Sequence, residues 1–240
     1  MQISVKFRHI RLLCALMFAS CMLPTIGQSV SAAPVRIACV GDSITWGYTI
    51  NHDRLARAWP GVLQKLVGKK YKSEDFGHNG ATLLKNGNVP YWKTRQFKGA
   101  TKFDPNIVII MLGTNDTKPI NWKKYGAQFT ANAEALVRHF EQLQAHPRIY
   151  ICTPPPVVRV KKLGIGNGWG INEKTLVHGV IPAIKRAARA MHIPVVHVHG
   201  QMIKQAREPM YKYFAHDGVH PDPLGQALMG KIIYRAVFRK

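Results

Sequence analysis

Short apolar runs recur along the chain, and longer segments with helical spacing lie between them. The runs cover residues 35–40, 107–112, 149–152 and 195–198. Continuous apolar runs of this length predict strands that are buried on both faces. Such strands alternating with amphipathic helices favour a mainly parallel sheet with helices on both faces and right-handed crossovers. We therefore expect an α/β fold with three layers, α/β/α.

The predicted helices carry apolar residues at intervals of three and four. The clearest cover residues 57–67, 125–143 and 172–191. Gly68 is expected to end the first of them, and Pro182 to bend the third. Asp222 and Pro223 mark the start of a last helix, because an acidic N-cap precedes a proline in the first turn. No linker divides these elements, so we predict a single domain over residues 34–240.

The N-terminal segment has the layout of a secretory signal. Three basic residues precede an apolar stretch over residues 12–23, and small residues follow at 30–33. The stretch is shorter than the roughly 20 residues that a membrane-spanning helix needs. We predict a signal peptide over residues 1–33 with cleavage at Ala32 or Ala33, and a secreted or periplasmic protein without a transmembrane span. Lipid anchoring through Cys21 is the alternative.

The chain is strongly basic. Its 34 Lys and Arg against 12 Asp and Glu give a formal net charge of +22 over 240 residues. Net charge indicates possible partners and not the fold. The basic residues are scattered, with no arginine-rich run or zinc-finger spacing, so we do not expect nucleic acid as the partner. An anionic glycan or an envelope surface is a candidate partner, and a basic polyanion-binding envelope protein is the rival hypothesis from a different functional class.

Cysteines are few. Outside the predicted signal peptide the chain keeps Cys39 and Cys152, and both lie in predicted buried strands. Two cysteines do not make a disulfide framework in a domain of this size. We expect two reduced, inert thiols.

Polar residues with catalytic chemistry follow the predicted strands. Ser43 comes after the first strand, Asn115 after the run at 107–112, and Asp217 and His220 precede the last helix. Loops at the carboxyl ends of parallel strands meet at one edge of the sheet. A hydroxyl nucleophile, an imidazole base and a carboxylate that orients the base are the groups that acyl transfer requires. The sequence thus predicts a serine esterase with Ser43, His220 and Asp217 as catalytic residues.

Acyl transfer also requires donors for the oxyanion that forms on the substrate. The Asn115 side chain, the backbone N–H of Gly80 and the backbone N–H of Ser43 are the candidates. Gly77 competes with Gly80 for this role. Each residue also has an ordinary structural use, because serine and aspartate cap helices and asparagine makes turns.

Together these motifs resemble the SGNH subgroup of the GDSL esterases and lipases. Gly41-Asp42-Ser43, Gly80, Gly113-Thr114-Asn115-Asp116 and Asp217-Gly218-Val219-His220 appear in the order of the family's four blocks. The resemblance implies a five-stranded, mainly parallel sheet with the flavodoxin-like strand order. It also implies Ser43 as nucleophile, Ser43, Gly80 and Asn115 as the oxyanion hole, and no metal or organic cofactor. Asp42 and Asp116 are expected to fix loops through hydrogen bonds.

Within the family, the sequence shows a looser similarity to exported bacterial carbohydrate O-acetylesterases, including the sialate type. It implies a small acetyl ester on a sugar as the substrate, with a lysophospholipase or thioesterase as the alternative. Three tryptophans are candidates for flat sugar-binding faces: Trp46, Trp92 and Trp169. We expect no metal site at His197 and His199, because a surface-facing alternation at the strand end is the simpler interpretation.

Overall fold

The protein folds around one five-stranded sheet. The structure is a computed structural model that describes residues 1–2, 33–166 and 169–239. The strand order is β2-β1-β3-β4-β5, and every pairing is parallel. This is the flavodoxin-like order, in which the site forms at the carboxyl ends of the strands where the strand order reverses, between β1 and β3. The prediction of fold class is confirmed. The strands are β1 (Val35–Gly41), β2 (Tyr71–Gly77), β3 (Ile107–Met111), β4 (Arg148–Cys152) and β5 (Val195–Val196).

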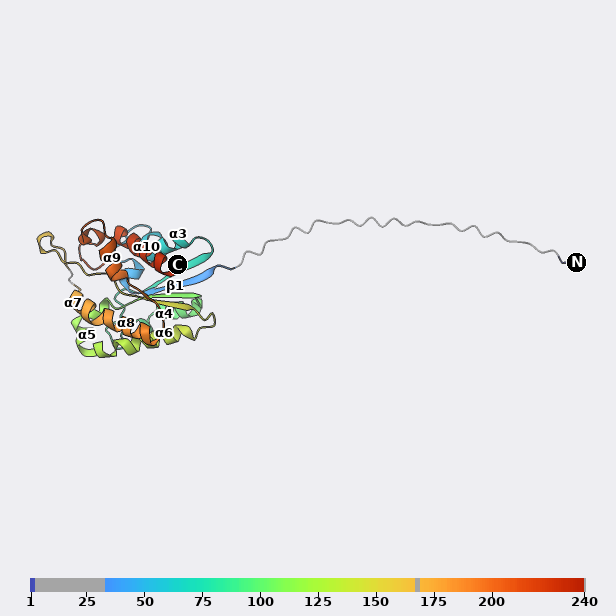
Figure 1. Ribbon diagram of the computed structural model, residues 1–240, viewed down its shortest axis with the longest axis horizontal. Helices are drawn as coiled ribbons and strands as arrows, with labels where there is room; N and C mark the ends of the chain where they lie inside the picture. Colours follow the sequence, from blue (N-terminus) through green and yellow to red (C-terminus); the bar gives the residue numbers. More distant parts are fainter. Residues whose placement is uncertain (3–32, 167–168, 240) are drawn as a thin grey trace. The chain divides into compact units, whose positions relative to one another are not determined.

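Helices cover both faces of the sheet (Figure 1). Alternate residues of β1 and β3 point to opposite faces, so Ala38 and Val40 belong to one apolar cluster and Ile37 and Cys39 to the other. Helices α4, α6 and α8 supply the first cluster, and α3, α9 and α10 supply the second. Their bounds are α3 (Trp59–Val67), α4 (Arg95–Phe103), α6 (Phe129–Glu141), α8 (Ile181–Ala190), α9 (Val198–Gln205) and α10 (Pro223–Phe238).

Short elements connect these helices and strands. They are α1 (Ser43–Trp46), α2 (Arg54–Arg57), η1 (Tyr91–Lys93), η2 (Asn115–Thr117), α5 (Pro119–Tyr125), η3 (Gly126–Gln128), η4 (Lys161–Leu163), α7 (Glu173–Thr175), η5 (Leu176–Val180) and η6 (Met210–Tyr213). Several follow the ends of strands, where the polar loop motifs lie.

One of the five strands does not correspond to any apolar run in the sequence. Strand β2 (Tyr71–Gly77) is polar and half-buried, and it pairs with β1 alone. An edge strand of this kind does not show the continuous apolar pattern of a central strand. At the other edge, β5 ends at Val196 and α9 begins at Val198. The prediction that 195–198 is all strand is therefore wrong, and His199 lies on a helix.

The predicted helices are present with changed bounds. The 57–67 segment becomes α3, which begins at Trp59 because Pro60 suits a first helical turn. Gly68 follows it with a positive φ of 72°. The 125–143 segment narrows to α6. In the 172–191 segment, the π-helical turn η5 precedes α8, whose first turn holds Pro182 and needs no N–H there.

The structure does not describe most of the segment predicted to be a signal peptide. Residues 3–32 contain nearly all of the predicted signal peptide, including Cys21 and Ala32, and lie outside the described residues. Among the residues that the structure does describe, no helix has the length and apolar character that crossing a membrane requires. Cys39 and Cys152 are buried free thiols.

Candidate active site

Three loops meet at the carboxyl edge of the sheet. Ser43 opens α1 directly after β1, Asn115 opens η2 after β3, and His220 lies shortly before α10. Their side chains line one pocket. The structure therefore brings together residues that are far apart in the sequence, as the parallel sheet predicts.

The turn before Ser43 is tightly packed. A Cβ atom on Gly41 would lie 1.9 Å from the Thr45 hydroxyl oxygen, so the position admits glycine alone. Asp42 caps α1 by accepting a hydrogen bond from the Ile44 N–H at 2.9 Å. Ser43 is 7% exposed, and as the first residue of α1 it has a backbone N–H without an intrahelical acceptor.

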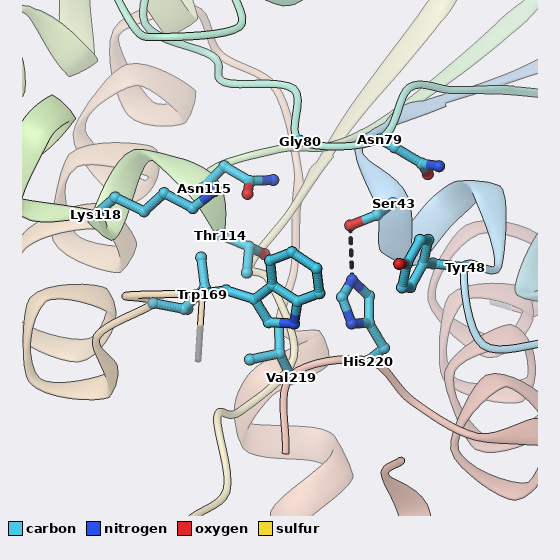
Figure 2. A pocket seen from close by; sticks show the side chains of 11 residues that line it. Ser43, Tyr48, Asn79, Gly80, Thr114, Asn115, Lys118, Trp169, Val219 and His220 are labelled. Atoms are coloured by element: carbon cyan, nitrogen blue, oxygen red, sulfur yellow. Dashed lines mark hydrogen bonds between the residues drawn. The ribbon is translucent and has the colours of Figure 1, made fainter. Parts of the chain in front are cut away.

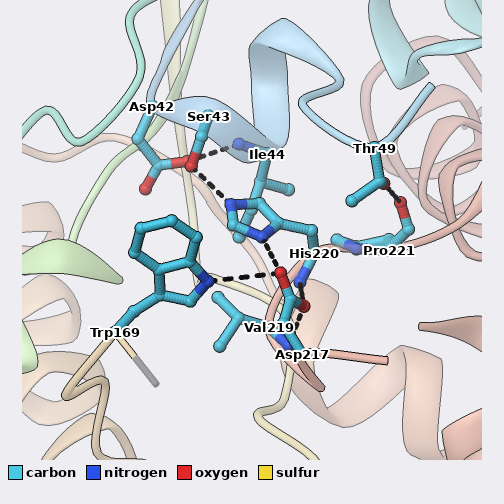
Figure 3. A network of polar contacts seen from close by, with 9 residues as sticks. All are labelled: Asp42, Ser43, Ile44, Thr49, Trp169, Asp217, Val219, His220 and Pro221. Carbon is cyan, nitrogen blue, oxygen red and sulfur yellow. Dashed lines mark hydrogen bonds and ion pairs between the residues drawn. The ribbon is translucent and has the colours of Figure 1, made fainter. Parts of the chain in front are cut away.

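The imidazole of His220 joins the serine to the aspartate (Figure 3). Its Nε2 atom lies 2.9 Å from Ser43 Oγ, and its Nδ1 atom lies 2.6 Å from Asp217 Oδ2. Since a carboxylate can only accept, Nδ1–H donates to Asp217 and Nε2 is left to accept from the serine. The constellation has the connectivity that a hydroxyl nucleophile requires.

Asp217 is held in its charged form. Burial raises the pKa of the Asp217 carboxyl. Hydrogen bonds from the His220 ring and from the backbone N–H groups of His220 and Val219 outweigh burial and hold this pKa well below its usual range. Gly218 makes this loop with a φ of 66°, and a Cβ there would lie 2.0 Å from the Val158 carbonyl oxygen. The loop thus fixes both the carboxylate and the imidazole.

Gly80 and Asn115 border the same space as the Ser43 hydroxyl (Figure 2). The Asn115 Nδ2 atom donates one hydrogen bond to the Ala81 carbonyl at 3.2 Å and has a second N–H for another acceptor. Gly80 has a φ of 79°. Gly77 lies instead beneath α1, where a Cβ would be 2.4 Å from the Trp46 backbone nitrogen. The structure therefore places Gly80, and not Gly77, in the wall of the pocket.

Asp116 ties two of these loops together. Its carboxylate accepts hydrogen bonds from the N–H groups of Leu83 and Leu84, at 3.0 and 2.8 Å, which links η2 to the segment that follows Gly80. Burial raises the pKa of Asp116 to about 7, and that of Asp42 to about 6. Both aspartates fix loops, in agreement with the prediction.

The pocket is small. Its volume is about 240 Å³, below the roughly 300–1,000 Å³ that is usual for drug-sized ligands. Aromatic rings stand beside the imidazole: Tyr48 lies 4.8 Å and Trp169 6.3 Å from the His220 ring, centroid to centroid. The Trp169 Nε1–H also donates to Asp217 Oδ2 at 3.3 Å. The pocket has room for a short acyl group beside the serine.

Three tryptophans were predicted to bind the substrate. Of these, Trp169 lines the pocket, with 48% of its surface exposed. Trp46 lies outside, with the Arg54 guanidinium 4.3 Å from its ring centroid. Trp92 packs against the core and donates from Nε1 to the Leu83 carbonyl at 3.0 Å. Trp46 and Trp92 therefore lie apart from the pocket, because both rings pack within the fold, and the pocket gives no support to their predicted contact with the substrate.

Some lining residues were not predicted from the sequence. They are Tyr48, Asn79, Thr114, Lys118, Ile171 and Val219. Asn79, Thr114 and Val219 lie directly beside predicted site residues, so proximity along the chain was an available signal. Tyr48, Lys118 and Ile171 have no such signal, because tertiary packing alone directs them to the pocket.

His199 makes a polar contact away from this pocket. Its Nε2 atom lies 2.8 Å from Glu173 Oε1. Among residues 33–166 and 169–239, the structure shows no group of three His, Cys, Asp or Glu side chains placed to hold a metal ion.

A three-layer α/β/α fold with serine, histidine and aspartate hydrogen-bonded in this order defines the class of serine hydrolases. Within that class, the chain belongs to the GDSL-like lipase/acylhydrolase family, whose model matches residues 39–228. The match includes all the motifs described above.

The chain is also similar to individual proteins. It is 30% identical over 239 residues to an acetylxylan esterase from Xylanibacter ruminicola, a match that covers 90% of this chain and 47% of the relative. The chain thus spans about half the length of that relative. The fold is similar to that of an aryl esterase from M. smegmatis, with 20% identity, a TM-score of 0.65, and coverage of 85% of this chain and 98% of the other. It is also similar to a carbohydrate acetylesterase family member from Sinorhizobium meliloti, with 22% identity, a TM-score of 0.62, and coverage of 84% and 96%.

Proposed function

We propose that the protein is a serine acetylesterase that removes O-acetyl groups from carbohydrate. The observation that carries this proposal is the Ser43–His220–Asp217 chain of hydrogen bonds, at 2.9 and 2.6 Å, at the wall of a small pocket. In this proposal Ser43, His220 and Asp217 are the catalytic residues.

In the first step, Ser43 Oγ attacks the carbonyl carbon of the ester while His220 Nε2 takes the hydroxyl proton. Negative charge develops on the carbonyl oxygen. The Ser43 and Gly80 backbone N–H groups and the Asn115 Nδ2–H donate to this oxygen. Asp217 stabilises the imidazolium, since its lowered pKa keeps the carboxylate charged.

The ester C–O bond then breaks, and His220 returns the proton to the departing alcohol. The product is an acetyl-serine. A water molecule, deprotonated by the same Nε2 atom, attacks this second ester and restores the Ser43 hydroxyl with release of acetate. The cycle needs only water as co-reactant.

The size of the pocket supports a short acyl group. The cavity of about 240 Å³ suits a short acyl group, and an acyl chain of eight or more carbons would bind best to a longer apolar surface. The name of the acetylxylan esterase relative supports an acetylated sugar as the alcohol part. The half-exposed Trp169 beside His220 offers a flat apolar face to a sugar ring.

Hydrolysis of 4-nitrophenyl acetate by wild type, Ser43→Ala and Ser73→Ala tests the proposal. Ser73 lies on β2, away from the pocket, and is the matched control. We expect Ser43→Ala to lose at least roughly 10³-fold in kcat with an unchanged circular dichroism spectrum, and Ser73→Ala to keep its activity. Turnover by Ser43→Ala at the wild-type rate would refute the role of Ser43.

Acyl esters of increasing length separate the acetylesterase from a lysophospholipase or thioesterase. We expect kcat/KM to fall from acetyl to octanoyl. A preference for eight or more carbons would contradict the acetyl proposal and favour those alternatives.

We further propose that the protein is exported through a signal peptide over residues 1–33. The basic, apolar and small-residue order of this segment supports the proposal. Removal of this segment takes away three basic residues and no acidic one, which leaves a formal net charge of +19, and this charge would attract anionic glycans of the envelope. N-terminal sequencing of the exported protein should find a start at Ala33 or Pro34, whereas a lipid-modified Cys21 would show the anchored form.

A further inference from the structure

The formal charge on the residues that line the pocket is positive. Lys118 is the lysine among the lining residues, and no Asp or Glu stands among them. The lysine lies just after η2, and its backbone N–H donates to the Asn115 carbonyl at 3.3 Å. Figure 2 draws its side chain beside Asn115, across the pocket from His220 and Tyr48. A positive charge therefore lies across the pocket from the nucleophile and its base.

Within the part of the chain that the structure describes, the Lys118 ammonium forms no ion pair. Burial lowers the pKa of this half-buried lysine, and the negative charge of Asp42 opposes the decrease only in part. A partly desolvated cation without a partner is unfavourable. An anion that entered the pocket would pair with it and recover that free energy.

We propose that Lys118 binds a carboxylate carried by the sugar of the ester substrate, so that the enzyme prefers acetylated acidic sugars to neutral ones. This inference rests on the proposed function and adds the charge of the substrate to it. The acetyl group itself is neutral, so the anion must be on the alcohol part. In the view of Figure 2, the Trp169 ring lies between His220 and Lys118, where a sugar ring would span from the ester to the ammonium.

The single ammonium favours a carboxylate over a phosphate. Phosphate sites gather several N–H donors or forked guanidinium groups, whereas one lysine supplies one compact positive charge. None of the described residues that line the pocket is an arginine. A singly charged carboxylate therefore matches the site.

The test compares an O-acetylated methyl galacturonoside with the methyl ester of its carboxyl group, which removes the negative charge and adds one methyl group. The readout is the ratio of kcat/KM for acetate release from the acid over that from the methyl ester. We expect a ratio of about ten for wild type in low salt, which falls as NaCl screens the attraction. In Lys118→Met the ratio should approach one, and in Lys118→Glu it should fall below one. Lys123→Met, on the exposed part of α5, should keep the wild-type ratio.

A wild-type ratio near one, or an equal ratio in wild type and Lys118→Met, would overturn the inference, even with full hydrolysis of 4-nitrophenyl acetate. A second measurement does not need turnover: calorimetric titration of free galacturonate into Ser43→Ala and into Ser43→Ala/Lys118→Met. We expect affinity to drop about tenfold in the double variant. If no ester is hydrolysed, the proposed function fails, and this titration still decides the role of Lys118: loss of affinity supports it and equal affinity refutes it.

Discussion

His220 contacts Asp217 twice, since its Nδ1 atom lies 2.6 Å from Oδ2 and its backbone nitrogen lies 3.0 Å from Oδ1. The aspartate therefore fixes both the ring and the main chain of the histidine. Two residues separate them in the sequence, and Gly218 supplies the positive φ that the turn between them needs. The same carboxylate orients the base and stabilises its protonated form.

Replacing Asp217 by Asn should lower kcat for 4-nitrophenyl acetate by roughly 10²–10⁴-fold, because an amide does not stabilise the imidazolium and favours the wrong tautomer. Asp222→Asn is the control. Asp222 caps α10 through Gly225, and asparagine caps helices equally well. Steady-state kinetics at pH 7 measures both variants. An Asp217→Asn enzyme within threefold of wild type would contradict the assignment.

Replacing Asn115 by Ala should lower kcat by roughly 10²–10³-fold with little change in KM, because the Nδ2–H donates to a charge that exists only in the transition state. Asn86→Ala removes an exposed asparagine whose Nδ2 donates to Gln128, and it should behave as wild type. A rise in KM at constant kcat for Asn115→Ala would instead indicate a role in ground-state binding.

The two glycines that compete for the second motif should respond differently to alanine. In Gly77→Ala the new Cβ meets the Trp46 backbone 2.4 Å away, so we expect a loss of about 3 kcal/mol or more in the free energy of unfolding. In Gly80→Ala the nearest atom is 3.8 Å away and only the positive φ is strained, which costs about 1–2 kcal/mol. Urea denaturation measures both. Equal losses would show that the backbone near Gly77 relaxes more easily than its packing suggests.

Asp42 should make stability depend on pH. Its folded pKa of about 6 is raised above the ordinary value of 3.8, so the folded state holds this proton more tightly than the unfolded state does. Stability from this group is therefore present at low pH and is lost as pH rises through about 4 to 6. His220, Asp116 and Lys118 also act on this region, so the comparison must be with a variant.

Asp42→Asn keeps a helix cap and removes the charge. From pH 4 to pH 7, the free energy of unfolding of wild type should fall relative to this variant by roughly 2–3 kcal/mol, at about 1.4 kcal/mol per pKa unit. Urea titrations at both pH values measure the difference. Parallel pH profiles for the two proteins would show that Asp42 does not titrate in this range.

The local sequence predicted the class of fold and the polar residues of the site for separate reasons. Strands β1 and β3 are buried on both faces, so nearly every residue in them is apolar and the signal is continuous. Gly41 to Ser43 and Asp217 to His220 are short segments whose spacing suits a turn. Ser43, Asn115 and His220 could be expected at one edge because parallel strands all end there.

Other features of the protein depend on the tertiary structure and leave no local pattern in the sequence. Strand β2 is polar because, as an edge strand, it has a paired neighbour on one side alone and lies half in solvent. The sequence does not distinguish Trp46 and Trp92 from Trp169. In the structure Arg54 packs on the Trp46 ring and Trp92 packs against the core, and of the three only Trp169 lines the pocket. Lys118 looks like any other lysine in a basic chain. Its side chain acquires a special environment only when η2 brings it beside Asn115 in the pocket, because the burial and the charges around a side chain come from neighbours that are distant in the sequence.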